Sequence, residues 1–171
     1  MRILITLLAA IALAGCNVSG GAIPIAGTVA ASQQPAVQAP TRVSVSRSVG
    51  IGTAGSLISA ERARVGISAP LIQHPALQAA AQVHADDIAR RGGLSHTGSD
   101  GSQVWDRVSR AGYVHCFVAE NIARGQPDVP SVIRAWIGSP GHYRNMVNPA
   151  AVHFGFARSS DVWVLVLARP C

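Results

Sequence analysis

The chain has 171 residues, of which 49% are hydrophobic, and a formal net charge of +6. This length accommodates one domain of ordinary size besides an export segment and excludes a large multidomain assembly. Every basic side chain is arginine, since the sequence contains no lysine, and the arginines are spread along the chain. Without a basic run or an aromatic-interleaved patch, the charge indicates a positively charged protein surface and argues against a nucleic-acid partner.

The first segment has the pattern of a bacterial lipoprotein signal. A positive start at Arg2 precedes an apolar run, residues 3–13, which is too short to span a bilayer. At residues 13–16 the sequence is Leu-Ala-Gly-Cys, in which two small residues precede a cysteine, as in a lipobox. We therefore expect residues 1–15 to be removed as a signal peptide and Cys16 to carry acyl chains such as palmitate. The alternative is an ordinary secretory signal with a chance cysteine.

Lipidation predicts a location in the cell envelope, outside the cytoplasm, with the membrane as a partner through Cys16. Asn17 is not the aspartate that retains lipoproteins in the inner membrane of enteric Gram-negative bacteria. In a Gram-negative source this favours the outer membrane and periplasm. Residues 16–51 are rich in small residues and proline and show no sustained period, with no charge before Arg42. They predict a flexible linker, followed by one domain at residues 52–171.

Helical patterns come first in this domain and strand patterns come last, which predicts an α+β fold. We expect helices at 53–65, 75–91, 102–110 and between Asp128 and Gly138, and strands at 114–122, 152–158 and 162–168. The second helix begins at Pro75 and carries a stripe typical of a buried face: Leu77, Ala80, Ala81, His84 and Ile88. Asp100 and Asp128 are expected to cap the third and fourth helices.

Two cysteines remain besides Cys16. In an exported chain, an even pair indicates a disulfide between Cys116 and Cys171. It would stabilise the domain by roughly 4 kcal/mol if its effect is mainly on the entropy of the unfolded chain. Two free thiols, or a pair of metal ligands, are the alternatives.

Three ionisable residues stand in settings that suggest a site. His96 precedes a Gly/Ser-rich loop, Glu120 interrupts an apolar strand, and His142 follows Pro140 and Gly141. A carboxylate in a buried strand is costly unless it is paired or bound to a metal. Two imidazoles and one carboxylate can hold Zn²⁺ or another divalent cation with an open position. The alternative is a structural hydrogen-bond network.

These residues fall in motifs that resemble the CAP superfamily, which includes cysteine-rich secretory proteins, antigen 5, pathogenesis-related proteins of class 1 and many bacterial SCP-like domains. The motifs are Leu94-Ser95-His96, Ala119-Glu120-Asn121-Ile122-Ala123, the run from Trp136 to Asn145, and Gly155 followed by a closing strand at Trp163. The similarity covers roughly residues 55–169. It implies an α-β-α sandwich with a small central antiparallel sheet and a surface cleft.

In many family members that cleft holds two histidines and two glutamates, and in some it binds a divalent cation. His96 and His142 match the histidines, and Glu120 matches the glutamate of the family's Gly-Glu-Asn motif, with Ala119 replacing the glycine. The second glutamate has no counterpart, because the corresponding stretch contains Ser139 and no carboxylate. This chain therefore has three of the four cleft residues.

The remaining polar and aromatic candidates favour structural roles. We expect His84 to be a satisfied core histidine, Asn121 and Asn145 to brace loops, and the tryptophans Trp105, Trp136 and Trp163 to lie in the core. His74, His115 and His153 are also expected to be structural.

The resemblance and the incomplete cleft favour a membrane-anchored binding module for a divalent cation, a small apolar or lipid ligand, or a wall component. The alternative is a metal-assisted hydrolase of peptide or ester bonds, in which Glu120 and His142 would be catalytic. A third possibility is a purely structural cleft.

Overall fold

The computed structural model describes the backbone of residues 41–171 and the side chains from residue 50 onward. The predicted signal peptide (1–15), Cys16 and the linker up to residue 40 lie outside the described residues, so these stay predictions. None of the helices in the described part is long and apolar enough to cross a membrane.

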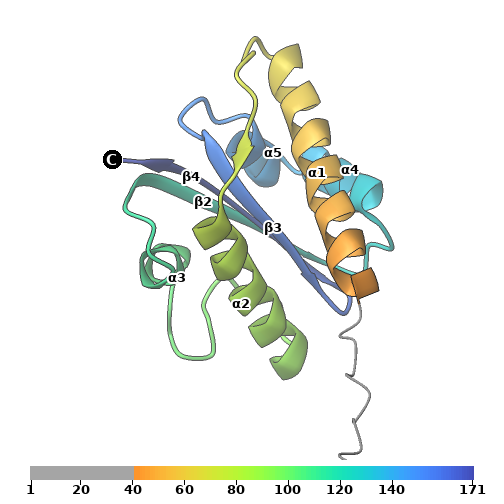
Figure 1. The fold of residues 1–171 in the computed structure, drawn as a ribbon, viewed down its shortest axis with the longest axis vertical. Coiled ribbons are helices and arrows are strands. Elements are labelled where there is room, and N and C mark those ends of the chain that lie inside the picture. The colour runs from red at the N-terminus through yellow and green to blue at the C-terminus, as the bar shows by residue number, and fades with distance from the viewer. Residues whose placement is uncertain (1–40) are drawn as a thin grey trace, which may run out of the picture. The chain divides into compact units, whose positions relative to one another are not determined.

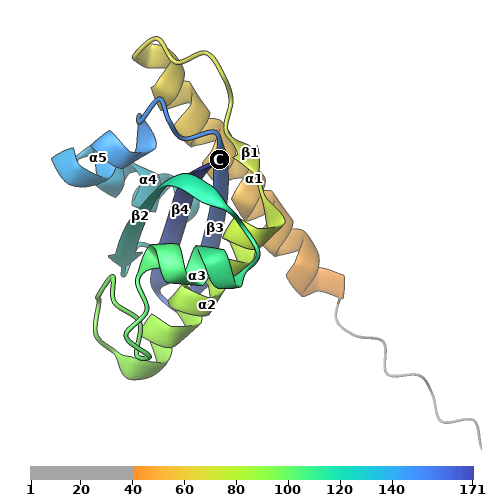
Figure 2. The same cartoon turned by 90° about the vertical axis from the view of Figure 1, so that its left-hand side faces the viewer.

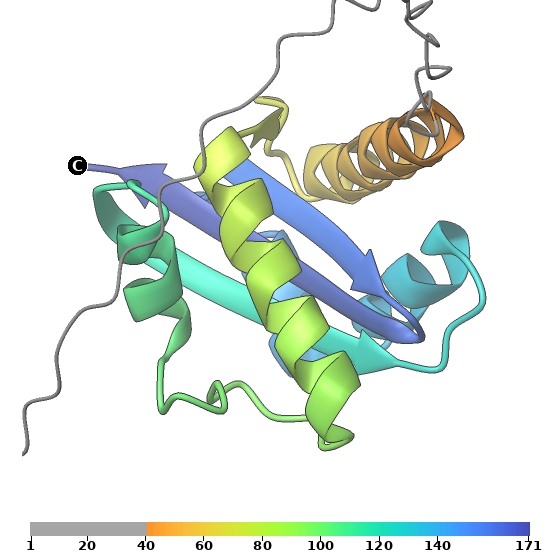
Figure 3. The same cartoon turned by 60° about the horizontal axis from the view of Figure 1, so that its bottom comes forward.

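The described chain forms three layers, with helices on both faces of one sheet (Figure 1). The elements are α1 (Thr41–Arg64), β1 (Ile72–Gln73), α2 (Pro75–Arg91), α3 (Val104–Arg110), β2 (His115–Arg124), α4 (Val129–Ile137), α5 (Pro140–Met146), β3 (His153–Ser159) and β4 (Val162–Pro170). Figures 2 and 3 show α2 and α3 together on one face, with α4 and α5 on the other. The predicted α-β-α sandwich is therefore confirmed.

The sheet has the strand order β1-β3-β4-β2, so β2 is an edge strand. The three long strands are antiparallel, as predicted. One short strand was not predicted: β1, which pairs with β3 in parallel and makes the sheet mixed. This strand has only two residues, directly before α2, and is too short to leave a periodic signature in the sequence.

Alternating residues of the strands divide the apolar interior into two cores. One core lies between the sheet and α1, α4 and α5; its largest members are Ile58, Trp136, Met146, Phe154, Phe156, Trp163, Leu165 and Leu167. The other lies between the sheet and α2 and α3; it contains Leu77, Ala81, Ile88, Val108, Ile122, Val162, Val164 and Val166. Each helical layer is therefore held by its own face of the sheet.

Helix α2 follows the sequence prediction closely. The His74 side chain accepts a hydrogen bond from the Ala76 N–H, Pro75 occupies the first turn, and Gly92 ends the helix in a left-handed conformation. Its buried face approaches β3 so closely that a Cβ placed on Gly155 would lie 2.2 Å from the Leu77 carbonyl carbon. A side chain larger than hydrogen at position 155 would therefore push α2 away from the sheet.

Three other helices depart from the prediction. Helix α1 begins at Thr41 and not at 53, inside the expected linker. Helix α5 forms where a stop was expected, because Pro140 is tolerated in a first turn even though it cannot continue a preceding helix. Gln103, not Asp100, occupies the N-cap of α3. Asp128 caps α4 as predicted, accepting from the Ser131 N–H at 2.8 Å.

A buried arginine joins α1 to the segment between α5 and β3. The Arg62 side chain is 1% exposed and donates to the carbonyl oxygens of Met146 (3.0 Å), Asn148 (2.8 Å) and Ala151 (2.8 Å). Burial lowers the pKa of this guanidinium. Because these three bonds tie α1 to the turn between α5 and β3, Arg62 fixes the path of the chain into β3.

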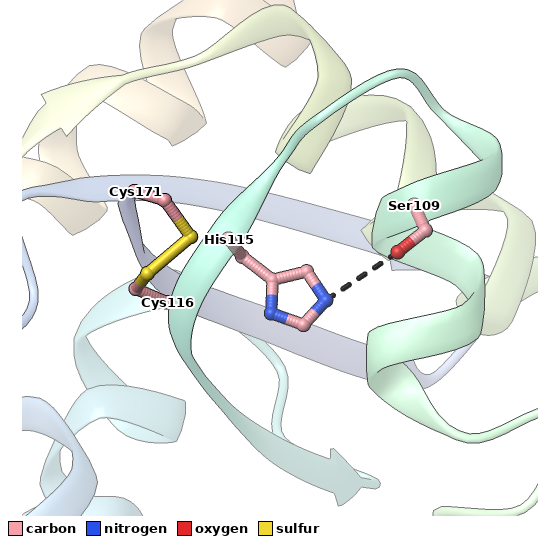
Figure 4. Close-up of a disulfide and its surroundings, with 4 residues drawn as sticks. All are labelled: Ser109, His115, Cys116 and Cys171. Carbon is pink, nitrogen blue, oxygen red and sulfur yellow. Dashed lines mark hydrogen bonds between the residues drawn. A yellow bond between two sulfur atoms is a disulfide. The ribbon is translucent and has the colours of Figure 1, made fainter.

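The predicted disulfide between Cys116 and Cys171 is confirmed (Figure 4). It joins the start of β2 to the residue that follows β4, with the two Cα atoms 4.8 Å apart. Because β2 and β4 are neighbours in the sheet, the bond fastens the chain terminus to the edge strand.

Two histidines and a tyrosine meet where β1, α2 and β3 come together. The Tyr113 hydroxyl lies 2.8 Å from His153 Nδ1, and the rings of His74 and His153 are 5.2 Å apart. Burial, and then the nearby His74, lower the pKa of His153. The neutral imidazole can accept the tyrosine proton, whereas a protonated ring cannot.

We predict that the domain loses stability as the pH falls below about 6.5. His153, His84 and His142 all have lowered pKa values in the fold. The unfolded chain therefore binds more protons than the folded chain between the folded pKa values and 6.5. The melting temperature at about pH 5 should be lower than at about pH 8, and His153→Gln should reduce that difference. An unchanged difference in the variant would contradict the role given to His153.

Candidate functional site

Glu120 lies on the edge strand β2 and is buried, with its side chain 2% exposed. Its neighbours Val118 and Ile122, two positions away on the strand, pack in the core under α2 and α3. Alternation along the strand therefore turns the Glu120 carboxylate towards the α2–α3 layer. A carboxylate in this apolar position requires partners for both of its oxygens.

The two oxygens of Glu120 have different partners. His96 Nδ1 lies 2.8 Å from Oε1, and Arg107 Nη2 lies 2.8 Å from Oε2. A carboxylate oxygen accepts, so His96 donates through Nδ1 and its other nitrogen, Nε2, is an acceptor when the ring is neutral. The prediction that His96 and Glu120 meet is supported by this contact.

Arg107 is the residue that the sequence prediction missed. Its side chain is 4% exposed, and it also donates to the carbonyls of Ser102 (2.8 Å) and His96 (3.1 Å). It stands on the buried stripe of α3, with Val108 next to it. A charged residue on an apolar helix stripe was the available signal, because such an arginine needs a buried acceptor.

His84 also lies beside Glu120, from α2. Its ring is fully buried, and Nε2 lies 3.0 Å from the Ser95 carbonyl and 3.6 Å from Glu120 Oε1. A carbonyl can only accept, which places the proton of the neutral ring on Nε2. Burial lowers the pKa of His84, against the opposing charge of Glu120. It is a satisfied core histidine at this nitrogen, as predicted.

His142 belongs to the other helical layer. It lies on α5, and Asn121 Nδ2 donates to its carbonyl oxygen at 3.0 Å. Asn145 Nδ2 in turn lies 2.8 Å from Asn121 Oδ1 and 3.2 Å from the Glu120 carbonyl. The two asparagines therefore brace the helix α5 against the strand β2, whereas the sequence had suggested that they brace loops. The His142 ring makes no hydrogen bond to Glu120 within the described residues, so the structure places it near His96 and Glu120 but outside their network.

His96 acts electrostatically on His142. Burial, and then the charge of His96, lower the pKa of His142. The side chain of His96 is 54% exposed, so this imidazole is accessible from solvent. Leu94 and Trp105 are each 50% exposed. The prediction that Trp105 lies in the core was wrong, because α3 turns its Arg107 and Val108 side inward and leaves Trp105 outside.

The arrangement does not fit a divalent cation held by His96, Glu120 and His142. Both Glu120 oxygens are engaged, and one of them faces the permanent positive charge of Arg107. A cation bound there would meet that charge at short range in a poorly solvated site. Across residues 50–171, no group of three or more His, Cys, Asp and Glu side chains is arranged to hold a metal ion.

The group of this network that can reach a ligand from solvent is the imidazole of His96. Glu120 fixes the His96 ring and its tautomer, much as a carboxylate orients a catalytic histidine. The same carboxylate is neutralised by Arg107 and shielded from water, so it cannot itself serve as a general base without breaking an ion pair. The site is therefore suited to hydrogen bonding through His96 and not to chemistry centred on Glu120.

Comparisons with known proteins agree on the kind of domain. A family model described as "CAP: Cysteine-rich secretory protein family" matches residues 56–165. The uncharacterized protein YkwD of Bacillus subtilis is 29% identical over 109 residues, which cover 63% of this chain and 42% of YkwD. The chain thus spans less than half the length of this relative.

Solved structures with the same fold come from several bacteria. An extracellular protein containing an SCP domain from Bacillus anthracis matches 77% of this chain and 44% of its own, with a TM-score of 0.71 and 20% identity. An outer surface protein from Borrelia burgdorferi matches 70% of this chain and 92% of its own, with a TM-score of 0.65 and 20% identity. A cysteine-rich secretory protein from Staphylococcus aureus matches 72% of this chain and 39% of its own, with a TM-score of 0.62 and 16% identity.

The family model covers most of the domain, including His96, Glu120 and His142, and the fold agrees with the three structures. This chain belongs to the cysteine-rich secretory protein (CAP) family.

Proposed function

We propose that this protein is an envelope-anchored CAP-domain binding module that uses the cleft at His96 and His142 to hold a lipid or cell-wall ligand. The observation that carries the proposal is that both carboxylate oxygens of Glu120 already have partners: one is bonded to His96 and the other to Arg107. Glu120, the residue that would take part in catalysis or bind a metal ion, therefore has a structural role. The accessible His96 imidazole remains free to contact a ligand.

The location outside the cytoplasm rests on three observations. Residues 1–16 have the pattern of a lipoprotein signal and lipobox. The disulfide between Cys116 and Cys171 suits an oxidising compartment. Two of the structural relatives are described as an extracellular protein and an outer surface protein. The anchor would be the acylated Cys16.

The apolar side chains near His96 support a ligand with an apolar part. Leu94 precedes His96 by two positions, and Trp105 lies on α3, whose Arg107 binds the His96 carbonyl. Exposed aromatic and aliphatic side chains around a polar group are typical of a binding site. The metal-assisted hydrolase is the less favoured reading, since Arg107 already neutralises Glu120, the carboxylate that a bound cation would need.

We predict that Cys16→Ser releases the protein from the membrane. The serine variant lacks the thiol that accepts the diacylglyceryl group, and two or more acyl chains are what make anchoring stable. Fractionation of cells that express each form should show the wild-type chain in the membrane pellet and the variant in the soluble fraction. Retention of the variant in the pellet would contradict lipid anchoring.

We predict that envelope binding depends on the cleft histidines. The full-length Cys16→Ser chain is sedimented with lipid vesicles and, separately, with isolated cell-wall material. Replacing both His96 and His142 with glutamine should weaken binding by about tenfold or more, because a lost hydrogen bond to a ligand costs about 1 kcal/mol or more. His115→Gln is the control, because His115 lies on β2 and is bonded to Ser109 on α3. The proposal would be wrong if the protein bound neither material, or if the double variant bound as tightly as the chain that keeps both histidines.

We predict no saturable zinc binding by the wild-type domain, and a gain of zinc affinity in Arg107→Met. Removing the guanidinium frees Glu120 Oε2 and leaves His84 and His96 beside the carboxylate. Calorimetric titration at neutral pH, on full-length Cys16→Ser protein with and without Arg107→Met, measures both. The His96→Gln form of the Arg107→Met chain should lose the gained affinity. Tight 1:1 zinc binding by the wild type would contradict the argument that Arg107 takes the place of a metal ion beside Glu120. It would favour the metal-assisted hydrolase.

A further inference from the structure

A hollow lies between α2 and α3, on the face of the sheet that these two helices cover (Figure 3). It has a volume of about 450 Å³ and is lined by residues of both helices and of the connecting segment 98–102. This volume is in the range of small-molecule sites. His96, Glu120 and His142 are not among its lining residues, so it is separate from the cleft proposed above.

Small apolar side chains leave the space for this α2–α3 pocket. Ala79 and Ala80 line it from α2, and Ala111 lines it at the end of α3. Val83, the largest aliphatic side chain of the lining, is 61% exposed, whereas Ile88 of the same helix is fully buried. Exposed apolar surface that gathers around a hollow is typical of a ligand site.

The polar side chains of the lining already have partners within the protein. Asp87 accepts from the N–H and from the hydroxyl of Ser99, at 2.8 and 2.5 Å. Asp100 accepts from the N–H of Ser102 at 2.9 Å, and Arg107 donates to the Ser102 carbonyl at 2.8 Å. These bonds hold the connecting segment against both helices and leave its polar groups engaged.

Two nitrogens of the lining residues are exceptions, but a ligand cannot reach them. His84 Nδ1 and Arg107 Nε have no hydrogen-bond partner among the described residues, and both atoms are buried with almost no accessible surface. The polar atoms of the inner wall are therefore either bonded to the protein or out of reach. Such a wall favours apolar contact over hydrogen bonding, because a polar group placed against it would lose water without gaining a partner.

Each arginine of the lining has an acidic partner. Arg90 Nη2 lies 3.3 Å from Asp87 Oδ1, and Arg110 Nη1 lies 2.5 Å from Asp100 Oδ2. The third arginine, Arg107, is paired with Glu120. A charged ligand would find no unpaired counter-charge in this lining, so the pocket favours an uncharged molecule.

We infer that the α2–α3 pocket binds the alkyl group of a small uncharged molecule. The alkyl group packs against Ala79, Val83 and Ala111, and removes the exposed side chain of Val83 from water. A neutral polar group at the other end of the molecule, such as a hydroxyl, stays at the mouth of the pocket in water. It stays there because the inner wall offers it no partner.

This site does not depend on the proposed envelope ligand. The pocket and the cleft at His96 and His142 have no ligand-contacting residue in common. Either proposal can therefore be wrong without the other.

The test is an NMR titration of ¹⁵N-labelled full-length Cys16→Ser protein with the straight-chain alcohols from 1-butanol to 1-heptanol. We expect saturable shifts in residues 79–87, 98–102 and 107–111. The affinity should rise by about threefold to fourfold with each added methylene, because each one leaves water for an apolar wall. The absence of saturable shifts in these segments, or an affinity that does not depend on chain length, overturns the proposal.

Three further probes of the same length test the polarity of the wall. 1,7-Heptanediol brings a second hydroxyl to the inner wall and should bind about tenfold more weakly than 1-heptanol. Heptanoate and heptylamine should bind no more tightly than 1-heptanol, since the charges of the lining are already paired. Equal binding of the diol and the alcohol, or tighter binding of either ion, overturns the assignment of an uncharged alkyl group.

Matched variants locate the site. Ala79 and Ala135 are both exposed on helices, so a phenylalanine at either position leaves the two cores intact. Ala79→Phe puts a ring into the pocket and should abolish heptanol binding, whereas Ala135→Phe on α4 should bind like the parent chain. The chain with both His96→Gln and His142→Gln should also bind like the parent. Unperturbed β-sheet resonances show that each variant is folded. Heptanol binding that survives in Ala79→Phe, or that is lost from the double histidine variant, would refute the location.

Discussion

The buried carboxylate of Glu120 is the constraint around which the polar interior is arranged. Burying an unpaired carboxylate is prohibitive, so the fold must bring a donor to each oxygen. His96 comes from the loop after α2, and Arg107 comes from α3. Arg107 then binds the carbonyls of His96 and Ser102, which fixes the loop between those residues. One acidic side chain thus orders the part of the chain that a hydrophobic core alone would leave loose.

Two consecutive residues of the edge strand β2 bind polar groups in the two helical layers. Glu120 faces α2 and α3, while the next residue, Asn121, faces α5 and binds the His142 carbonyl and the Asn145 side chain. The two polar networks therefore meet at one sheet edge. The Cys116–Cys171 bond holds the start of the same strand. Arg62 plays the corresponding role at the opposite side, where it clamps the turn that leads into β3.

Membership of the CAP family establishes the fold, and the chemistry has to be argued from the site. The family resemblance suggested a metal-binding cleft with three of four polar residues. In this chain Arg107 supplies the positive charge that a metal would bring, and supplies it permanently because a guanidinium does not titrate in the working range. This favours ligand recognition over metal-assisted hydrolysis.

Local signals in the sequence determined much of this protein. The apolar stripe of α2, its start at Pro75, its end at Gly92 and the long apolar run of β4 each follow from rules that act over a few residues. The disulfide follows from the count of cysteines in an exported chain. These local signals predicted the α+β fold and three of the four strands, whereas the layers and the site residues His96 and Glu120 were expected from the family resemblance. The two-residue β1, the early start of α1, helix α5 and the exposure of Trp105 depend on packing between distant segments. Only the tertiary structure placed Arg107 and His84 against Glu120, because residues 13 and 36 positions away were brought together by the docking of α3 and α2 on one face of the sheet. Whether a buried carboxylate binds a metal or an arginine is decided by which side chain that docking delivers, and no short-range pattern carries that information.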